Sequence, residues 1–161
     1  MATYTAKLEW SRRAAKFTDH KYSRAHTWQF DGGLIVRASS SPNHVPLPYS
    51  DAAAVDPEEA YVAALASCHM LWFLYLAAGS RFVVNSYHDE PRGTMDKDEA
   101  GRKVITQVTL APHVVFSGGH RPTDADYEAL HHEAHEACFL ANSVKTIIVT
   151  KGTWEFTGTF A

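Results

Sequence analysis

The sequence predicts a single α+β domain over residues 1–161, and three observations lead to that class. Apolar residues make up 45% of the 161 residues, which is enough for one core without disulfide support. Segments that alternate like strands are grouped in runs instead of alternating one by one with helices. Helix-start signals at 56–59 and 123–126 divide these runs. We therefore expect the element order βββ-α-ββ-α-β.

The N-terminal third is predicted to form three strands, at 3–10, 25–30 and 34–39. Asp31-Gly32-Gly33 marks a hairpin between the last two strands, because glycine adopts positive φ at low cost. The segment between the first two strands is polar and reads as a loop that presents cations, namely Arg12, Arg13, Lys16, Lys21 and Arg24. Residues 40–55 contain three prolines and no periodicity, which indicates an irregular connector.

A long central helix is expected to begin at Asp56-Pro57-Glu58-Glu59 and to end near Gly79. Asp56 is a capping residue, and two carboxylates in the first turn suit the helix dipole. Of the 20 residues from 60 to 79, 17 are apolar, so a membrane span is an alternative. The polar Ser67-Cys68-His69 at its centre and the strands on both sides favour a buried helix.

A helix that is apolar on every face needs cover on every face. The chain offers little sheet for that purpose, so we expect an obligate homodimer in which a second subunit supplies the missing cover. Beyond the helix, strands are predicted at 81–90 and 103–116, separated by a polar turn. A second helix is predicted from Thr123 to about Cys138, and a final strand at 144–156.

The composition predicts where the protein is found and which classes of partner it lacks. Two cysteines are too few for a disulfide scaffold, and residues 1–10 lack the apolar segment of a secretory signal, so we expect a cytoplasmic protein. The 15 Lys and Arg residues against 18 Asp and Glu include no basic run. We therefore expect no nucleic-acid and no membrane partner, and favour a small molecule or a protein.

Cys68 is the first candidate for chemistry. At 100° per residue it shares a helix face with Glu58 and with the apolar side chains of Tyr61, Leu65 and Trp72. A core cysteine is the simpler interpretation. Apolar surroundings raise a thiol pKa, so a reactive thiolate at mid-helix would need a cation from elsewhere, and the basic loop at 11–24 is the obvious donor.

Cys138 is the second candidate. Its spacing from Tyr127, Leu130 and Ala134 places it at the apolar edge of the second helix, where core packing is again an alternative. Two thiols on inward helix faces can meet although 70 residues separate them. In a cytosolic protein such a pair is more often redox-active or metal-binding than structural.

The ten histidines offer a rival chemistry. His131, His132 and His135 precede Cys138, and the first and third form an i, i+4 pair that could hold zinc. The order His-His-Glu-Ala-His lacks the metalloprotease pattern, and a solvated helix face is the simpler interpretation. His69 points away from the helix face that carries Cys68, so we expect it to be a packing or hydrogen-bonding residue rather than a catalytic base. No resident metal is predicted.

These motifs together resemble the OsmC/Ohr family of organic hydroperoxide resistance and osmotically inducible proteins. The resemblance rests on Asp56-Pro57-Glu58-Glu59-Ala60, on Ala66-Ser67-Cys68-His69, and on His135-Glu136-Ala137-Cys138 followed by Asn142-Ser143. Tyr22-Ser23-Arg24-Ala25-His26 before Asp31-Gly32-Gly33, with Ser40-Ser41-Pro42 after it, fits the first hairpin of the family, so nearly the whole chain is covered.

The resemblance implies a thiol peroxidase fold with a long buried central helix, in an intertwined homodimer with active sites at the interface. It makes Cys68 the peroxidatic cysteine, Cys138 the resolving cysteine, and Glu58 the residue that holds an essential arginine. Arg24 is the best match for that arginine, and Arg13 competes because the loop is longer than the family's Gly-Gly-Arg form. Phe139 stands where the classical enzymes have proline, which suggests a divergent branch.

The implied chemistry agrees with the residues. A guanidinium stays charged when partly buried and can stabilise a thiolate that attacks a peroxide. Attack leaves a sulfenic acid on Cys68, which Cys138 would convert to a disulfide. No resident cofactor is expected; an external dithiol, for which the family suggests lipoyl groups, would reduce the disulfide. An apolar lining would favour organic or lipid hydroperoxides over hydrogen peroxide, and its candidates are Tyr61, Leu65, Trp72, Phe73 and Phe139.

One geometric inference concerns the subunits. Ten helical residues span about 15 Å, too far for Glu58 and Cys68 of one straight helix to grip the same guanidinium. We therefore expect the Glu58–Arg24 pair that meets Cys68 to come from the other subunit. Two alternatives stay open: a non-catalytic relative that binds a hydrophobic ligand, and a zinc protein built on the His and Cys cluster.

Overall fold

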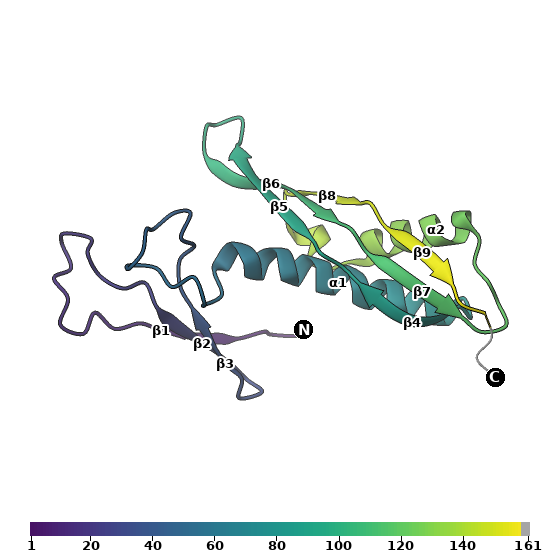
Figure 1. The fold of residues 1–161 in the computed structure, drawn as a ribbon, viewed down its shortest axis with the longest axis horizontal. Coiled ribbons are helices and arrows are strands. Elements are labelled where there is room, and N and C mark those ends of the chain that lie inside the picture. Colours follow the sequence, from purple (N-terminus) through teal and green to yellow (C-terminus); the bar gives the residue numbers. More distant parts are fainter. Residues whose placement is uncertain (159–161) are drawn as a thin grey trace. The chain divides into compact units, whose positions relative to one another are not determined.

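The computed structural model describes residues 1–158, which form two compact units, Met1–Ala60 and Tyr61–Ala161. Each unit is described by itself. The single domain expected over residues 1–161 stays a prediction. The fold is α+β, as expected, with nine strands, two α-helices and a short 3-10 helix among the described residues (Figure 1).

The first unit contains a three-stranded antiparallel sheet in the order β1-β2-β3. Its strands are β1 (Ala6–Glu9), β2 (His26–Phe30) and β3 (Ile35–Ala38). The predicted hairpin joins β2 to β3: Gly33 adopts a φ of +87° and donates its N–H to the carbonyl of Phe30 at 2.9 Å. The long connector to the next element is irregular, as its prolines predicted.

The helix α1 (Pro57–Gly79) begins and ends as the sequence predicts. The Asp56 side chain accepts the Glu59 N–H at 2.7 Å, and the Glu59 carboxylate accepts the Asp56 N–H at 3.3 Å, which is a capping box. After Gly79 the positive φ belongs to Arg81, at +64°, while the Phe82 N–H closes the helix onto the Ala77 carbonyl.

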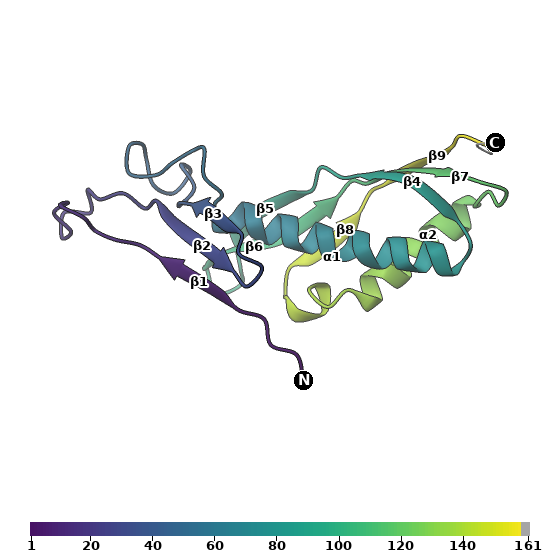
Figure 2. The same cartoon turned by 90° about the horizontal axis from the view of Figure 1, so that it is seen from below.

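The second unit contains two three-stranded sheets, β4-β7-β9 and β5-β6-β8. Within each sheet the first pair is antiparallel and the second pair parallel. The strands are β4 (Val83–His88), β5 (Arg92–Lys97), β6 (Lys103–Leu110), β7 (His113–Ser117), β8 (Ile147–Thr150) and β9 (Thr153–Phe156). Figure 2 shows α1 and the second helix, α2 (Asp124–Ala137), on the same side of these strands.

The strand count differs from the sequence prediction in three places. The segment expected to be a turn at 91–102 contains β5, and the strands expected at 103–116 and 144–156 are each divided in two. Pro112 interrupts the first because it lacks a backbone N–H, and Lys151-Gly152 interrupts the second. The observed order is therefore βββ-α-ββββ-α-ββ, with the 3-10 helix η1 (Ala141–Ser143) after α2.

Two hydrophobic cores hold α1 in the second unit. Leu65 and Ala66 pack with Val108 and Leu110 of β6 in one core. The other core joins α1 and α2 to β4 and β7, through Phe73, Ala77, Phe82, Val114, Phe116, Tyr127, Leu130 and Ala134. The helix α1 has the length and composition of a membrane span, but these contacts make it a core helix.

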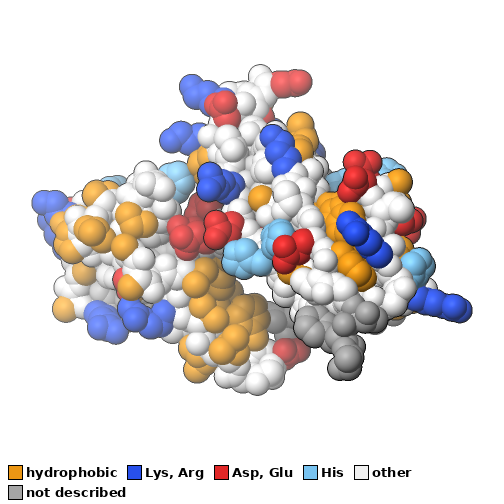
Figure 3. Space-filling view, turned by 45° about the vertical axis from the view of Figure 1, so that its right-hand side comes forward, with side chains coloured by type: hydrophobic (Ala, Val, Ile, Leu, Met, Phe, Trp, Pro, Cys, Tyr) orange, Lys and Arg blue, Asp and Glu red, His pale blue; other side chains and the backbone are white. Residues whose placement is uncertain are grey.

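The opposite side of α1 is not covered in one chain. Leu71 is 60% exposed and Tyr75 is 71% exposed, so the buried helix that the sequence predicted is buried along one face. Other hydrophobic side chains are exposed in patches among the charged groups (Figure 3).

Candidate active site

Cys68 lies on α1 between the parts of the helix that enter the two cores. Leu65 and Ala66 precede it in one core, and Phe73 and Ala77 follow it in the other. The helix is therefore fixed on both sides of the cysteine, while the thiol-bearing residue itself is half-buried. A half-buried thiol on a rigid element can meet both a substrate and a second thiol.

Cys138 is the C-cap of α2, and 1% of its surface is exposed. It lies on the buried face with Tyr127, Leu130 and Ala134, as the spacing predicted. The chain turns directly after it: the Asn142 N–H bonds to the Cys138 carbonyl at 3.0 Å, and the Ala141 N–H bonds to its Sγ at 3.4 Å. The turn into η1 thus fixes the position of the thiol.

The two thiols meet. Both cysteines are free, and Cys68 lies close enough to Cys138 to affect its pKa. Burial, and then the neighbouring Cys68 thiol, raise the pKa of the Cys138 thiol to about 11, so it is protonated at neutral pH. A half-buried cysteine beside a buried, protonated one is an arrangement in which the first can be oxidised and the second can form a disulfide with it.

Arg24 lies in the first unit and is held by its neighbours. Its Nη1 donates to the carbonyls of His20 at 2.7 Å and Tyr22 at 2.5 Å, and its guanidinium stacks 3.9 Å from the centre of the Tyr22 ring. His26 contacts the backbone of Arg24, with 2.8 Å between its Nδ1 and the Arg24 carbonyl oxygen. Its other ring nitrogen, Nε2, accepts the Trp28 indole N–H at 2.9 Å.

Glu58 lies in the same unit as Arg24. It faces His44, with 3.9 Å between Oε1 and the imidazole Nε2, and its Oε2 is buried without a hydrogen-bond partner among residues 1–158. Arg24 and Pro57, the residue before Glu58, line one largely apolar hollow of about 350 Å³. The ion pairs within residues 1–158 do not include Glu58 with Arg24, so that pairing stays a prediction.

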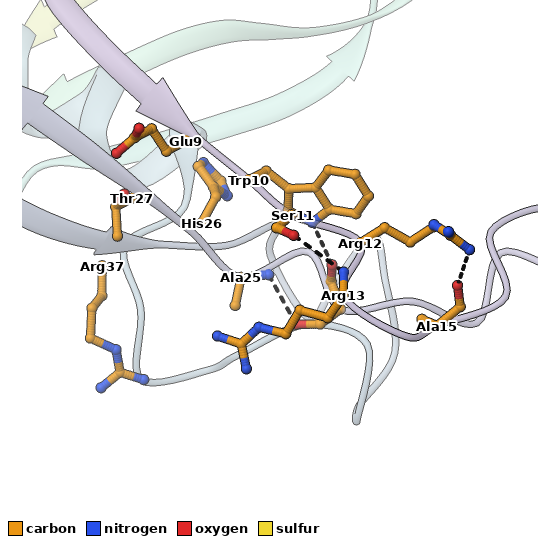
Figure 4. Close-up of a pocket in the computed structure, with 11 residues that line it drawn as sticks. Glu9, Trp10, Ser11, Arg12, Arg13, Ala15, Ala25, His26, Thr27 and Arg37 are labelled. Atoms are coloured by element: carbon orange, nitrogen blue, oxygen red, sulfur yellow. Dashed lines mark hydrogen bonds between the residues drawn. The ribbon is translucent and has the colours of Figure 1, made fainter.

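Arg13, the competing arginine, lines a different hollow of about 690 Å³ in the first unit (Figure 4). Arg12 and Arg37 line it too, but both are engaged: Arg12 donates to the Ala15 carbonyl at 2.9 Å, and Arg37 pairs with Asp51 at 2.5 Å. Arg13 has a φ of +52°. Arg13 and Arg24 therefore line different hollows of the first unit.

The residues expected to line a substrate pocket lie in different surroundings. Leu65 and Phe73 are buried in the two cores, with 2% and 0% of their surfaces exposed. Trp72 packs edge-on against Phe139 at 5.4 Å, which joins α1 to the residue after Cys138, and Phe139 is 68% exposed. Tyr61 instead bonds through its hydroxyl to Thr146 at 2.7 Å.

One prediction about the histidines is wrong. His131 does not belong to a solvated helix face: it is 7% exposed and bonds to His69, with 2.9 Å between His69 Nε2 and His131 Nδ1. His69 is therefore a packing and hydrogen-bonding residue, as expected, whereas His132 is exposed. At 100° per residue His131 shares the face of Tyr127 and Cys138, so the wheel that located the cysteine could have located the histidine.

The pair is held in its neutral form. Burial, and then the neighbouring His69, lower the pKa of His131 to about 3. Burial also lowers the pKa of His69 to about 4, with His135 adding to the effect. Within residues 1–158, no three His, Cys, Asp or Glu side chains are placed to hold a metal ion, so the zinc hypothesis has no ligand set in the described part of the chain.

Residues 50–151 match the family model described as OsmC-like protein. A structure of an OsmC-like protein of unknown function from Vibrio cholerae is 52% identical, with a TM-score of 0.92 over 94% of this chain and 99% of that one.

More distant structures share the fold. An organic hydroperoxide resistance protein from Elizabethkingia anophelis is 14% identical with a TM-score of 0.66, over 98% of both chains. The organic hydroperoxide resistance protein OhrB of Bacillus subtilis is 17% identical with a TM-score of 0.62, over 96% of this chain and 98% of that one. The search of curated proteins finds no match.

Proposed function

This chain belongs to the OsmC-like protein family, and on that premise we propose that it is a cysteine-based thiol peroxidase that reduces organic hydroperoxides. The observation that carries the proposal is the proximity of the Cys68 and Cys138 thiols, which contributes to the raised pKa of Cys138. Relatives with this fold bear the name of organic hydroperoxide resistance, which agrees with that chemistry.

In the proposed reaction the Cys68 thiolate attacks the terminal oxygen of the hydroperoxide. The O–O bond breaks, the alcohol leaves with a proton, and Cys68 becomes a sulfenic acid. The Cys138 sulfur then attacks the Cys68 sulfur, its proton leaves with the hydroxyl as water, and a disulfide forms. An external dithiol of the lipoyl class reduces the disulfide by exchange, so no resident cofactor is required.

We assign Arg24 as the cation that stabilises the Cys68 thiolate, oriented by Glu58. A guanidinium suits this role because it remains charged in partly buried surroundings. Arg24 and Glu58 lie in the first unit, whereas both cysteines lie in the second. The distance along α1 between Glu58 and Cys68 supports a homodimer in which the arginine of one subunit meets the thiols of the other.

The uncovered side of α1 supports the same dimer. Leu71 and Tyr75 are exposed in one chain, and a second subunit would remove their apolar surface from water. The aromatic contact of Trp72 with Phe139, next to Cys138, supports an organic substrate over hydrogen peroxide. Free thiols agree with the reducing cytoplasm as the compartment.

The test is steady-state consumption of cumene hydroperoxide with dihydrolipoamide as reductant. We expect turnover by the wild type, faster than with hydrogen peroxide, and loss of turnover in both Cys68→Ser and Cys138→Ser. Cys138→Ser should still consume about one equivalent, because attack by Cys68 does not need the second thiol. The peroxidase proposal fails if hydroperoxide leaves the Cys68 thiol titre unchanged, and a hydrophobic-ligand protein would then be favoured.

A further inference from the structure

The buried pair of His69 and His131 has no role in the chemistry described so far. The two rings are 1% and 7% exposed, and they lie with their centres 5.2 Å apart and their planes within 5°. One nitrogen of each is used in the 2.9 Å bond between them. The other two nitrogens, His69 Nδ1 and His131 Nε2, are buried and have no hydrogen-bond partner within residues 1–158.

Because the nitrogens at both ends have no partner, the two neutral rings can adopt two tautomeric arrangements. A neutral imidazole carries one N–H and one lone pair. If His69 donates the shared proton, His69 Nδ1 has the lone pair and His131 Nε2 has the N–H; if His131 donates it, the ends are reversed. Changing from one arrangement to the other moves one proton from one end of the pair to the other and changes the charge of neither ring.

His131, which carries the outer end, also lines a hollow of about 430 Å³ in the second unit. His131 lines it from α2, and Thr150, Lys151, Gly152 and Trp154 line it from β8, β9 and the link between them, together with Asp124, Tyr127 and Glu128 of α2. A hollow of this size can hold water or a small buffer molecule beside the His131 side chain.

The inner end belongs to the residue next to Cys68. His69 follows Cys68 directly on α1, and His135 lies close enough to His69 to affect its pKa. On α2, His131, His135 and Cys138 follow one another at spacings of four and three residues and so share one face. The His–His contact and the Cys–Cys contact therefore join the same two helices.

We propose that His69 and His131 form a proton relay between the thiol pair and the hollow beside β9. This inference rests on the proposed function. When Cys68 loses its thiol proton, His69 Nδ1 takes up a proton, the shared proton shifts from His69 to His131, and His131 Nε2 releases one proton into the hollow. The reverse sequence returns a proton for the alkoxide that leaves when the O–O bond breaks.

The surroundings allow this role. The lowered pKa values keep both rings neutral, which the two arrangements require. The charged and titratable groups that face the pair are His135 and Tyr127 next to the rings and Asp124, Glu128 and Lys151 in the hollow. Phe73 and Tyr127 hold the His131 ring in place at 4.4 and 4.5 Å between ring centres.

The first test is nitrogen NMR of the histidine rings in the reduced wild-type protein at neutral pH. We expect the four ring nitrogens of His69 and His131 to give averaged shifts, because the two arrangements exchange. One fixed tautomer for each ring would overturn the relay. This measurement does not depend on peroxidase activity, so it decides the relay even if the proposed function fails.

The second test is the rate at which one equivalent of cumene hydroperoxide oxidises Cys68. In His131→Gln the amide keeps a hydrogen bond to His69 but does not exchange tautomers, so we expect the rate to fall by at least about tenfold at neutral pH. His132→Gln is the matched control, because His132 is the exposed neighbour on α2. In His131→Ala, added imidazole should enter the hollow and restore the rate with saturation.

A rate in His131→Gln within about twofold of the wild type would overturn the relay. Equal restoration of His131→Ala by imidazole and by pyrazole, which has the same size but is far less basic, would also overturn it, since filling space would then suffice. Absence of Cys68 oxidation in the wild type would refute the peroxidase proposal, and the ring tautomers would still decide the relay.

Discussion

Cys138 and Cys68 differ in their surroundings, and that difference agrees with the roles proposed for them. Cys138 is almost fully buried and keeps its proton, whereas Cys68 is half-buried on a helix that is fixed on both sides. A resolving thiol that stays protonated until a sulfenic acid forms next to it does not compete for peroxide. The first prediction follows from this asymmetry.

Alkylation of Cys138 by iodoacetamide should continue to rise with pH throughout the mildly alkaline range. A thiol of pKa about 11 gains thiolate by about tenfold per pH unit up to that value, so no plateau is expected below about pH 10. In Cys68→Ala the plateau should move to lower pH, because the neighbouring thiol that helps to raise the pKa of Cys138 is lost. A plateau near pH 8 in the wild type would contradict the assignment.

The buried histidines make stability depend on pH. Their pKa values in the folded state, about 4 for His69 and about 3 for His131, lie below the ordinary value of 6.5, so the unfolded chain binds more protons between these limits. Their contribution to the free energy of unfolding is complete above pH 6.5 and is lost as the pH falls toward 4 and then 3, by up to about 1.4 kcal/mol per pH unit for each ring.

Urea unfolding of the wild type at pH 7.5 and at pH 5 measures this loss. His131→Gln should be less stable at pH 7.5 but should lose less stability between the two pH values, because one of the two groups no longer titrates. His132→Gln should keep the wild-type difference, since that side chain is exposed. An equal difference in all three proteins would show that the buried pair does not control the dependence.

The inward positions of the two cysteines could be predicted from the sequence, whereas the contact between His69 and His131 could not. Helical spacing placed Cys138 on the inward face of α2, and its burial agrees. The same spacing places His131 on that face, but a histidine's polarity made a solvated position the simpler interpretation. Its buried position depends on a partner on α1, His69, and a contact across 62 residues is a property of the fold.

Among the elements, those with strong local signals were predicted and the others were not. Both helices begin at capping boxes, formed by Asp56 with Glu59 and by Thr123 with Asp126, whose residues lie three positions apart in the sequence. β5 was missed because it is an exposed edge strand with no apolar alternation. It is a strand because it pairs with β6, and its own sequence does not predict that pairing.

Gly152, in the link between β8 and β9, is required by a close approach. A Cβ at this position would collide with the Tyr127 hydroxyl and would lie 2.9 Å from the Pro112 carbonyl oxygen. The Tyr127 hydroxyl donates to the Thr153 carbonyl at 3.1 Å, so its position ties α2 to β9. The glycine thus lets the helix and the strand meet beside the hollow.

Gly152→Ala should lower the free energy of unfolding by about 1–3 kcal/mol, because the strand link or the tyrosine must move. Gly119→Ala is the matched control: a Cβ there meets nothing within 4 Å, so its effect should be within about 0.5 kcal/mol. Equal midpoints for the two variants in urea would contradict the close approach.

At the scale of the whole molecule, the division of the chain into two units separates the components of the proposed site. Arg24 and Glu58 belong to Met1–Ala60, and both cysteines belong to Tyr61–Ala161. The family could be identified from sequence because its motifs are local. The assembly could not be derived in the same way, because the residues that would meet across a dimer have no shared pattern along the chain.

Mixing two inactive variants tests the assembly. In a dimer of Arg24→Ala with Cys68→Ser, one site receives a normal arginine and normal cysteines if these come from different subunits. Random exchange of the two variants should therefore restore about a quarter of wild-type activity. Sites built within one subunit would give none. A mixture of Cys68→Ser with Cys138→Ser is the control and should stay inactive, because both changes fall in one unit.

The central claim is that Cys68 and Cys138 form one redox pair. Its most direct test is peptide mapping of the wild-type protein under non-reducing conditions after one equivalent of cumene hydroperoxide. The account predicts a disulfide between the peptides that contain Cys68 and Cys138, and its loss on addition of dihydrolipoamide. Recovery of both cysteines as free thiols after hydroperoxide treatment would contradict it.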